Sequence, residues 1–339
     1  MNNFPLVSVF IPAYNHEKYI ADSIESVINQ TYKNIELLII NDASTDNTNQ
    51  IILKYIDECR NRFIRFEYRN NTENKGITNS MNESVKWARG KYFTANASDD
   101  IMMPCKIKVL VEALENNKDD NISVAFGEAS YINESGENIY FDIKTGKLID
   151  DNIGVNNLIE RYSLMRNINY KDSRIFGSYD SLINGDYLPP GGYMLKTKML
   201  HKISAWTDGN TAEDWELWLK LSKISKFIYI DKVVYLYRIH STNTVNVNHK
   251  GLVYSHLNLL KREKEYAFKL GKEKIYWNNF SNIVLTILFH FSLSDAIKEI
   301  FENLYNFVFL NNLVFNFFKR IYDKIFRLSS YIVKYLKRI

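Results

Sequence analysis

The chain of 339 residues is poor in cysteine and lacks the usual marks of an exported protein. Its two cysteines, Cys59 and Cys105, provide neither a disulfide framework nor a ligand set for zinc or an iron–sulfur cluster. The first residues, Met1 to Pro5, contain no basic segment and no apolar stretch long enough for a secretory signal. These absences fit a reducing compartment, and we therefore expect a cytoplasmic protein.

Long hydrophobic runs are also missing. Ile283 to Leu293 is strongly apolar but short, and Leu304 to Phe318 carries no charge but contains four asparagines. A comfortable membrane-spanning helix needs roughly 20 predominantly apolar residues. We therefore expect no segment that crosses a membrane.

The usual phosphate-binding glycine motifs are absent as well. No Gly-x-Gly-x-x-Gly follows the first apolar run, and no Gly-x4-Gly-Lys-Ser/Thr occurs in the chain. This argues against a nucleotidyltransferase, which would need a basic, glycine-rich loop near its first strand. A bound diphosphate would need another source of positive charge.

Positive charge is concentrated at the end of the chain. The formal net charge is +4, but Lys319 to Ile339 alone carries +6, which leaves −2 for the rest. The basic residues of this tail are Lys319, Arg320, Lys324, Arg327, Lys334, Lys337 and Arg338. A mildly acidic body with a basic tail indicates a negatively charged partner for the tail alone, and no nucleic acid as a partner of the body.

The chain does contain a repeated pattern of apolar runs that end abruptly in polar residues. Val7 to Asn15 and Leu37 to Ser44 are two such runs, and each is followed by apolar residues at helical spacing. This pattern predicts buried parallel strands whose carboxyl ends open into loops. With 46% hydrophobic and 24% charged residues, the chain can fill a large globular core.

The same pattern extends over most of the chain. Predicted strands lie at 35–40, 63–68, 91–96, 123–127, 227–230 and 233–237. Predicted helices lie at 20–28, around 51–56, at 74–88, after residue 104, around 155–165 and at 213–221, and from residue 252 onward. Gly90 is expected to end the third of these helices as a glycine cap, and loops are expected over most of 130–190. We predict an α/β domain of residues 1–250 with a mainly parallel sheet flanked by helices, followed by a helical region of residues 251–339.

Two pairs of polar residues follow predicted strands. Tyr14 and Asp42 stand at strand ends, where ligands of open α/β sheets bind, and could stack on a base and hydrogen-bond its edge. Alternatively, Tyr14 shields a sheet edge and Asp42 caps the next helix. Asp99 and Asp100 are adjacent carboxylates that repel each other unless a cation is present, and such oxygen ligands suit Mg²⁺ or Mn²⁺. A solvated acidic turn is the alternative for this second pair.

Two further sites could carry chemistry. Glu213 and Asp214 begin a predicted helix and could supply a general base, although the helix dipole also favours acids in a first turn. His240 follows the last predicted strand and could be a core histidine, a phosphate contact or a metal contact.

Taken in order, these segments resemble the family 2 inverting glycosyltransferases, which have a GT-A fold. The resemblance covers roughly residues 6–245. It rests on Ile11-Pro12-Ala13-Tyr14-Asn15, on Asn41-Asp42-Ala43-Ser44-Thr45-Asp46-Asn47-Thr48, and on Asn74-Lys75-Gly76 with Asn82, Ala88, Gly90 and Tyr92. One departure is Ala97, which stands where the family often has the first aspartate of Asp-x-Asp-Asp.

The resemblance implies a role for each matched residue. Pro12, Tyr14, Asn15, Asp42 and Asn74 would belong to the nucleotide pocket, most often for uridine. Asp99 looks like the metal-binding aspartate, with Asp100 beside it, and Asp214 looks like the catalytic base of a Glu-Asp motif that includes Glu213. Gly191 and Gly192 resemble small residues of the sugar cleft, and His240 matches a Tyr-Arg-x-His segment near the diphosphate.

The implied function is a metal-dependent, inverting transfer of a hexose from a nucleotide sugar, most often a UDP-sugar, to a hydroxyl of a glycan. Mg²⁺ or Mn²⁺ would serve as the cofactor. The alternative is a non-catalytic nucleotide-sugar-binding or membrane-scaffolding protein, which would keep Tyr14 and Asp42 without needing Asp214.

The basic tail also has apolar residues at spacings of three and four, from Ile321 to Ile339. Such a basic amphipathic helix is typical of segments that lie on an anionic membrane. We expect a peripheral protein at the inner face of the cell membrane, acting on a lipid-linked or surface glycan acceptor. The alternative is a helix that packs on the catalytic domain with a solvated basic face.

Overall fold

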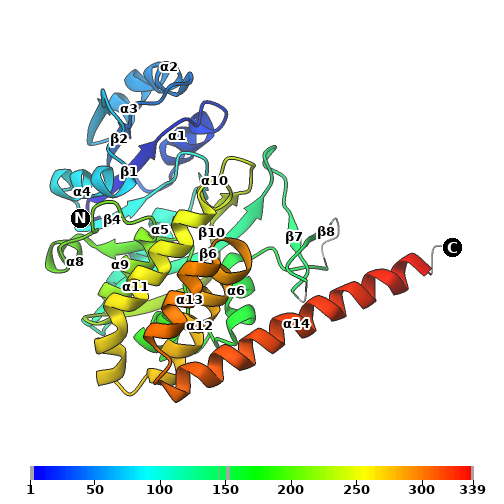
Figure 1. Ribbon diagram of the computed structural model, residues 1–339. Coiled ribbons are helices and arrows are strands. Elements are labelled where there is room, and N and C mark those ends of the chain that lie inside the picture. Colours follow the sequence, from blue (N-terminus) through cyan, green and yellow to red (C-terminus); the bar gives the residue numbers. More distant parts are fainter. Residues whose placement is uncertain (1–3, 144, 150–152, 337–339) are drawn as a thin grey trace. The chain divides into compact units, whose positions relative to one another are not determined.

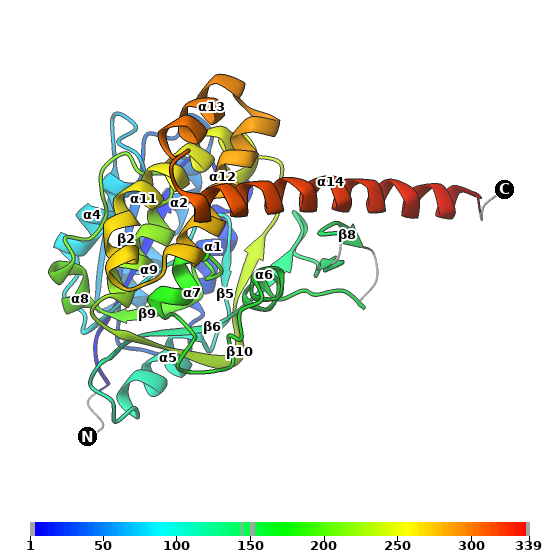
Figure 2. The same cartoon turned by 60° about the horizontal axis from the view of Figure 1, so that its bottom comes forward.

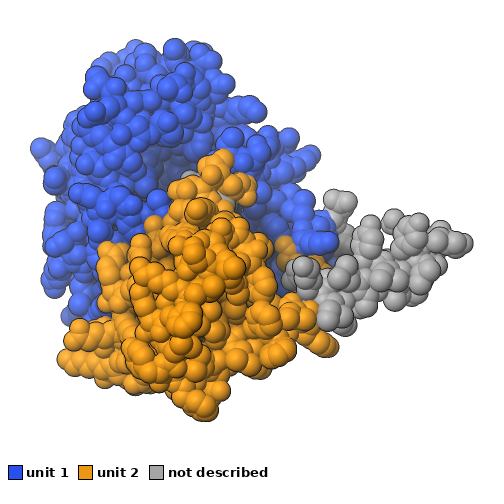
Figure 3. Space-filling view, in the orientation of Figure 1, with its two compact units in different colours: residues 1–143, 147–182, 186–243 blue, residues 144–146, 183–185, 244–339 orange. Residues whose placement is uncertain are grey.

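The computed structural model describes residues 4–143, 145–149 and 153–336, with side chains described in these ranges except at 244, 245 and 324–336. The chain forms two compact units (Figure 3). Unit 1 comprises residues 1–143, 147–182 and 186–243, and unit 2 comprises 144–146, 183–185 and 244–339. The predicted domain boundary at residue 250 stays a prediction.

Unit 1 is built on an eight-stranded sheet with the spatial order β3-β2-β1-β4-β9-β6-β10-β5 (Figure 1). Only β9 and β5 run antiparallel to their neighbours, so the predicted mainly parallel α/β sheet is confirmed. The strands are β1 (Val7–Ala13), β2 (Ile35–Asn41), β3 (Arg65–Asn70), β4 (Tyr92–Ala95), β5 (Ile101–Met102), β6 (Ile122–Ile132), β9 (Tyr193–Lys196) and β10 (Lys226–Arg238). A separate small sheet pairs β7 (Tyr140–Phe141) with β8 (Leu148–Ile149).

Helices up to residue 222 flank this sheet and connect its strands. They are α1 (Ile20–Ile28), α2 (Thr48–Lys54), α3 (Ile56–Arg62), α4 (Ile77–Trp87), α5 (Lys106–Glu115), α6 (Leu158–Arg166), α7 (Tyr179–Ile183), α8 (Thr197–Lys202) and α9 (Glu213–Ser222). The predicted helices at 20–28 and 213–221 are confirmed. The helix predicted around 51–56 is two short helices, because the chain breaks at Tyr55.

The two strands predicted at 227–230 and 233–237 are one strand, β10. It pairs with β6 from Lys226 to Arg238, and its register shifts between Ile230 and Val233. The polar residues Asp231 and Lys232, which lie between the two predicted strands, form this exposed irregularity in a continuous strand. Pairing with a long neighbour therefore outweighs the local polar interruption.

Gly90 is needed for a different reason from the one predicted. Helix α4 ends at Trp87, and its cap residue, Ala88, is extended rather than left-handed. A Cβ at Gly90 would lie 2.6 Å from the backbone nitrogen of Ser8 and 2.7 Å from its hydroxyl oxygen. The glycine thus permits a close approach of the chain to β1, and is not a left-handed helix cap.

Strands β1 and β2 form the centre of the core because both of their faces are covered. All seven residues of β2 are buried, and in β1 only Pro12 is partly exposed. The buried acid Glu36 accepts hydrogen bonds from the Ser8 hydroxyl at 2.6 Å, from the Arg89 backbone at 2.6 Å and from Arg65 Nη1 at 3.0 Å. Its charge is thereby paired inside the sheet.

The order of the strands places a switch point at β1. The chain runs from β1 to β2 and β3 on one side, and then returns to β4 on the other side of β1. Ligands of open α/β sheets bind outside the carboxyl ends of the strands at such a point. The loops that follow β1 and β4 are therefore the first place to look for a site.

Unit 2 is helical, as predicted for the region from residue 252 onward. Its helices are α10 (Thr244–Val247), α11 (His249–Lys269), α12 (Glu273–His290), α13 (Leu293–Glu302) and α14 (Phe307–Leu336), and α12 packs against α11, α13 and α14. Figure 2 shows α14 as one continuous helix. The side chains of Lys324, Arg327 and Lys334, and all of Lys337 and Arg338, lie outside the described residues, so the predicted basic amphipathic character of the tail stays a prediction. In the described part of the chain, no helix has both the length and the apolar character to cross a membrane.

The packing of β2 leads to a stability prediction. Replacing the fully buried Ile39 by alanine should reduce the free energy of unfolding by about 2–5 kcal/mol, because a cavity forms between covered sheet faces. Ile64 is 70% exposed and offers a matched control, for which Ile64→Ala should change stability by no more than about 0.5 kcal/mol. Urea denaturation followed by circular dichroism measures both, and equal effects of the two substitutions would contradict the assigned core.

Candidate active site

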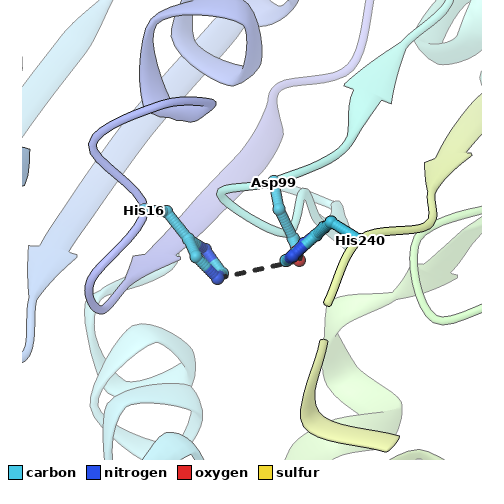
Figure 4. Close-up of side chains that lie close together, drawn as sticks. All are labelled: His16, Asp99 and His240. Carbon is cyan, nitrogen blue, oxygen red and sulfur yellow. Dashed lines mark hydrogen bonds and ion pairs between the residues drawn. The ribbon is translucent and has the colours of Figure 1, made fainter. Parts of the chain in front are cut away.

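Two histidines and one aspartate meet beyond the carboxyl ends of β1, β4 and β10 (Figure 4). His240 Nε2 lies 3.0 Å from Asp99 Oδ2, and His16 Nε2 lies 3.7 Å from the same oxygen. One ligand atom from each residue can be chosen so that all three lie within 4.8 Å of one another. Because His16 follows β1 and Asp99 follows β4, the cluster stands at the switch point of the sheet.

The turn that carries Asp99 is held in place by β10. Buried Asp100 accepts a hydrogen bond from the Arg238 backbone nitrogen at 2.7 Å and another from the Tyr235 hydroxyl at 2.9 Å. Arg238 Nε in turn donates to the Asp99 carbonyl oxygen at 2.9 Å. These bonds fix Asp99 opposite His240, which lies two residues beyond the end of the strand.

The protonation tendencies of the cluster follow from burial and neighbouring charge. Burial lowers the pKa of His16, an effect that the charge of Asp99 partly opposes, so its ring favours the neutral form at pH 7. Burial raises the pKa of Asp99, but the hydrogen bond with His240 and the electrostatic influence of the two histidines outweigh this and hold it below its usual value. The result is an ionised carboxylate beside His16 in its neutral form, as metal binding requires.

The chemistry of these donors fits a divalent ion. The other ring nitrogens are already oriented, since His16 Nδ1 lies 2.7 Å from Ser98 Oγ and His240 Nδ1 lies 2.8 Å from Thr242 Oγ1. Asp99 Oδ2 and His240 Nε2 lie 3.0 Å apart, close enough that both would hold the same ion. A carboxylate with two imidazoles is a ligand set for a transition-metal ion such as Mn²⁺.

Asp100, the second predicted metal ligand, is placed differently from Asp99. Both of its oxygens accept bonds from β10, as described above, and it is absent from the His16–Asp99–His240 group. Burial, followed by the charge of Asp99, raises its pKa well above the usual value. The structure thus gives Asp100 a positioning contact, and its role as a metal ligand stays a prediction.

The predicted nucleotide pocket is organised by the loops after β1 and β2. Asn15, with a left-handed φ of 52°, accepts a hydrogen bond from the Thr45 backbone at 2.7 Å and so ties the two loops together. Asp42 does not cap the next helix. Its carboxylate accepts bonds from Asn71 Nδ2 at 2.8 Å and from the backbone nitrogens of Lys75 and Gly76 at 3.0 and 2.8 Å.

Other predicted pocket residues differ in exposure. Tyr14 is 45% exposed, so its ring is accessible to a ligand. Asn74 is exposed and its side-chain oxygen accepts the Gly76 backbone N–H at 3.0 Å. Pro12 pairs with Ile40 within the sheet. The roles of Pro12, Tyr14, Asn15, Asp42 and Asn74 toward a nucleotide stay predictions.

Gly191 and Gly192 are buried beside the Asp99–Asp100 turn. A Cβ at Gly191 would lie 1.9 Å from the Tyr235 ring, and one at Gly192 would lie 2.6 Å from Pro189. The Gly191 carbonyl accepts a hydrogen bond from Lys106 Nζ, and burial lowers the pKa of this fully enclosed lysine well below its usual value. Close packing therefore accounts for both glycines, while their predicted contact with a sugar stays a prediction.

Glu213 and Asp214 lie with a third carboxylate, Asp186, at the start of α9. Burial raises the pKa of Glu213 to about 7, and the charge of Asp186 adds to this. Burial, the charge of Glu213 and that of Asp186 raise the pKa of Asp214 well above its usual value. Burial likewise raises the pKa of Asp186 to about 6. Carboxylates with raised pKa values bind a proton more readily than ordinary ones, as a general base must.

Several residues of the site were not found from the sequence. Arg238 lies in the Tyr-Arg-x-His segment, but no role was predicted for it, and His16 is a loop histidine for which none was predicted either. Asn243 Nδ2 donates to the Arg238 carbonyl at 3.1 Å and Asn243 Oδ1 accepts the His240 backbone N–H at 2.7 Å. His16 follows the Pro-x-Tyr-Asn segment directly, and this position was the only available hint.

The mainly parallel sheet with its flanking helices defines a GT-A-like architecture. The mannosyltransferase PcManGT from Pyrobaculum calidifontis, solved in complex with GDP-Man and Mn²⁺, has a TM-score of 0.55 at 13% identity, covering 95% of this chain and 89% of that one. S. aureus TarS 1-349, solved in complex with UDP-GlcNAc, has a TM-score of 0.50 at 18% identity, covering 82% and 80%. At these identities the likeness concerns the fold.

Sequence comparison identifies the family. The model of glycosyl transferase family 2 matches residues 8–172. An uncharacterized glycosyltransferase of Haemophilus influenzae is 30% identical over 296 residues, which cover 87% of this chain and 81% of that protein. The chain belongs to glycosyl transferase family 2, and it is a glycosyltransferase, as the sequence motifs predicted. Several other relatives are longer, and the chain spans only 30% to 36% of their length.

The cluster leads to a metal-binding prediction. His240→Gln should weaken Mn²⁺ binding by at least about tenfold, because an imidazole ligand is lost. His201→Gln, at an exposed histidine of α8, is the matched control and should leave binding unchanged. Titration followed by electron paramagnetic resonance measures the affinity, and equal affinities of both variants and the unaltered chain would contradict the site. Because burial lowers the pKa of His16, protonation of this ligand should weaken binding only at a pH below that at which an ordinary histidine takes up a proton.

The two adjacent aspartates should respond differently. Asp99→Asn should reduce Mn²⁺ affinity by at least about tenfold with little loss of stability, because the ligand oxygen carries the charge. Asp100→Asn should lower the unfolding free energy by about 1–3 kcal/mol, because one of its oxygens is replaced by an NH₂ group facing a donor. Affinity and urea denaturation are measured on the same samples, and the reverse pattern would make Asp100 the ligand.

Proposed function

We propose that this chain transfers a hexose from a UDP-sugar to a hydroxyl of a glycan acceptor, with inversion at the anomeric carbon. The observation that carries the proposal is the His16–Asp99–His240 cluster at the switch point of a GT-A-like sheet. The UDP-GlcNAc complex of TarS supports a UDP-sugar as the donor. The loops between residues 130 and 190 would decide which sugar and which acceptor bind. Where these loops differ from those of TarS, the bound sugar and the acceptor would differ as well.

Tyr14 and Asp42 would hold the uridine. The exposed ring of Tyr14 offers a stacking face at the end of β1. Asp42 holds the loop at Asn71–Gly76, and would either bond the uracil edge directly or place this loop against it. Both residues stand at the carboxyl edge of the sheet, where a nucleotide is expected.

The cofactor would be a divalent ion on His16, Asp99 and His240. The two imidazoles favour Mn²⁺ over Mg²⁺, and the Mn²⁺ complex of PcManGT supports the same ion. When bound, the ion supplies positive charge for the departing diphosphate. It would thereby replace the glycine-rich phosphate loop that the sequence lacks.

Asp214 would act as the base. Its carboxylate removes the proton from an acceptor hydroxyl as that oxygen forms a bond to the anomeric carbon and the bond from this carbon to the diphosphate oxygen breaks. Attack and departure on opposite faces invert the configuration in one step. Burial, then the charges of Glu213 and Asp186, raise the pKa of Asp214, which makes its ionised carboxylate a better proton acceptor than an ordinary aspartate.

The acceptor and the location of the enzyme follow from the basic tail. A segment with a net charge of +6 would hold the chain at the inner, anionic face of the cell membrane. An acceptor at such a surface would be a lipid-linked or surface glycan precursor. The enzyme would then be cytoplasmic and peripheral.

The assignment of the base leads to a kinetic prediction. Asp214→Asn should reduce kcat by at least about 10²-fold, the usual scale of general-base catalysis, and leave the affinity for UDP unchanged. Activity of the unaltered enzyme should rise with pH across the range in which Asp214 loses its proton, since only the ionised carboxylate accepts one. Release of UDP from a panel of UDP-sugars and GDP-sugars with a glycan acceptor measures the rate.

The control is Asp231→Asn, which removes a carboxylate that is 76% exposed in β10. This variant should keep the normal rate. Near-normal turnover of Asp214→Asn would rule out this base. Preference for GDP-sugars would instead contradict the proposed uridine pocket, and it would not affect the assignment of Asp214 as the base.

A further inference from the structure

Helices α13 and α14 of unit 2 expose apolar side chains in rows that follow the helix period. On α14 the exposed row consists of Phe307, Val308, Val314, Phe315, Phe318, Ile321 and Tyr322. We call these seven residues the α14 stripe. Their spacings of three and four residues place them along one side of the helix. Phe307, Phe315 and Phe318 are each between 63% and 75% exposed, which is unusual for phenylalanines of a stable surface.

The opposite side of α14 is packed, but through polar anchors as well as apolar contacts. Buried Asn316 donates from Nδ2 to Ser281 Oγ of α12 at 2.7 Å. Arg320 Nη2 donates to the Asn282 carbonyl at 2.8 Å and to Thr286 Oγ1 at 3.0 Å. Polar residues thus fix α14 to α12 while a row of aromatic residues faces outward, the reverse of an ordinary surface helix.

Helix α13 shows the same reversal. Leu293, Ile297 and Phe301, four residues apart, are exposed, whereas Glu299 is buried and paired with Lys261 of α11. Each of the two helices therefore presents an apolar row that the described part of unit 2 does not cover. Exposed apolar patches of this kind mark interaction surfaces.

The charge of the adjoining segment indicates what the stripe binds. The stripe merges into the segment from Lys319 onward, which carries +6. A second copy of the chain packed stripe against stripe in parallel would bring two such segments together, and like charges oppose this. An anionic lipid surface instead accepts the apolar rows between its headgroups and attracts the basic segment.

We propose that the α14 stripe, with the exposed row of α13, is an interfacial lipid-binding surface that inserts aromatic side chains into an anionic membrane. This deepens the proposed function, on which it rests for the membrane location of the acceptor. It assigns the anchoring to residues 307–322, whereas the sequence placed it in the basic segment alone. The basic segment provides attraction, and the stripe provides the buried apolar area.

The test measures binding of the full chain to vesicles in the absence of any donor. The chain should sediment with vesicles of phosphatidylcholine and phosphatidylglycerol, and less with phosphatidylcholine alone. Phe315→Ser combined with Phe318→Ser should lower the partition coefficient at least about tenfold, since two inserted rings are lost. Ile64→Ser, at an equally exposed isoleucine of unit 1, is the matched control and should bind as the unaltered chain does.

Each opposing outcome would overturn the proposal. Failure of the unaltered chain to sediment with anionic vesicles, or full binding by the double variant, excludes a lipid-binding stripe. Equal binding to neutral and to anionic vesicles would contradict an anionic membrane as the partner. A dimer in light scattering that the double variant converts to monomer makes a second copy the partner instead. Sugar transfer to a soluble acceptor is assayed in parallel. If neither the unaltered chain nor any variant transfers a sugar, the proposed function is contradicted, while the result with vesicles still stands.

Discussion

The buried carboxylate of Asp100 is the contact on which the rest of the site depends. It joins the turn after β4 to the end of β10 by accepting one bond from the Arg238 backbone and one from the Tyr235 hydroxyl. Arg238 then reaches back to the Asp99 carbonyl and also donates to Asp22 Oδ2 at 2.7 Å. A buried polar group is costly unless its hydrogen bonds are satisfied, so this arrangement has one favourable geometry. That geometry sets Asp99 against His240.

Burial also affects the carboxylates of unit 1 in two different ways, because one stays ionised and another favours its protonated form. Asp99 stays ionised, since the hydrogen bond with His240 and the electrostatic influence of the two histidines outweigh its burial. Asp214 shares a partly enclosed region with Glu213 and Asp186, where burial and like charge favour the protonated form. One carboxylate is thereby suited to hold a cation and another to accept a proton. Environments that push the pKa values of carboxylates apart in this way are typical of active sites.

Much of the fold could be predicted, because apolar periodicity reports burial directly. The run from Ile35 to Asn41 has no polar interruption other than Glu36, and it is a covered central strand. Predictions were wrong where a distant partner outweighed the local pattern. Two strands were predicted on either side of Asp231 and Lys232, but pairing with β6 continues β10 through these residues. Gly90 suggested a helix cap, but the proximity of Ser8 explains the glycine.

The sequence by itself determined the family, the alternation of strands and helices, and the acids at the strand ends, because these depend on neighbours in the chain. Only the tertiary structure decided which side chains meet. His16 and His240 are separated by more than two hundred residues, and no periodicity connects them before the sheet brings β1, β4 and β10 to one edge. The same holds for the outward side of α14, because only the packing of α12 against the opposite face decides which aromatic residues are exposed. Local patterns in the sequence indicate which residues are buried. The geometry of the site depends instead on long-range packing between distant segments, and no short segment shows this packing.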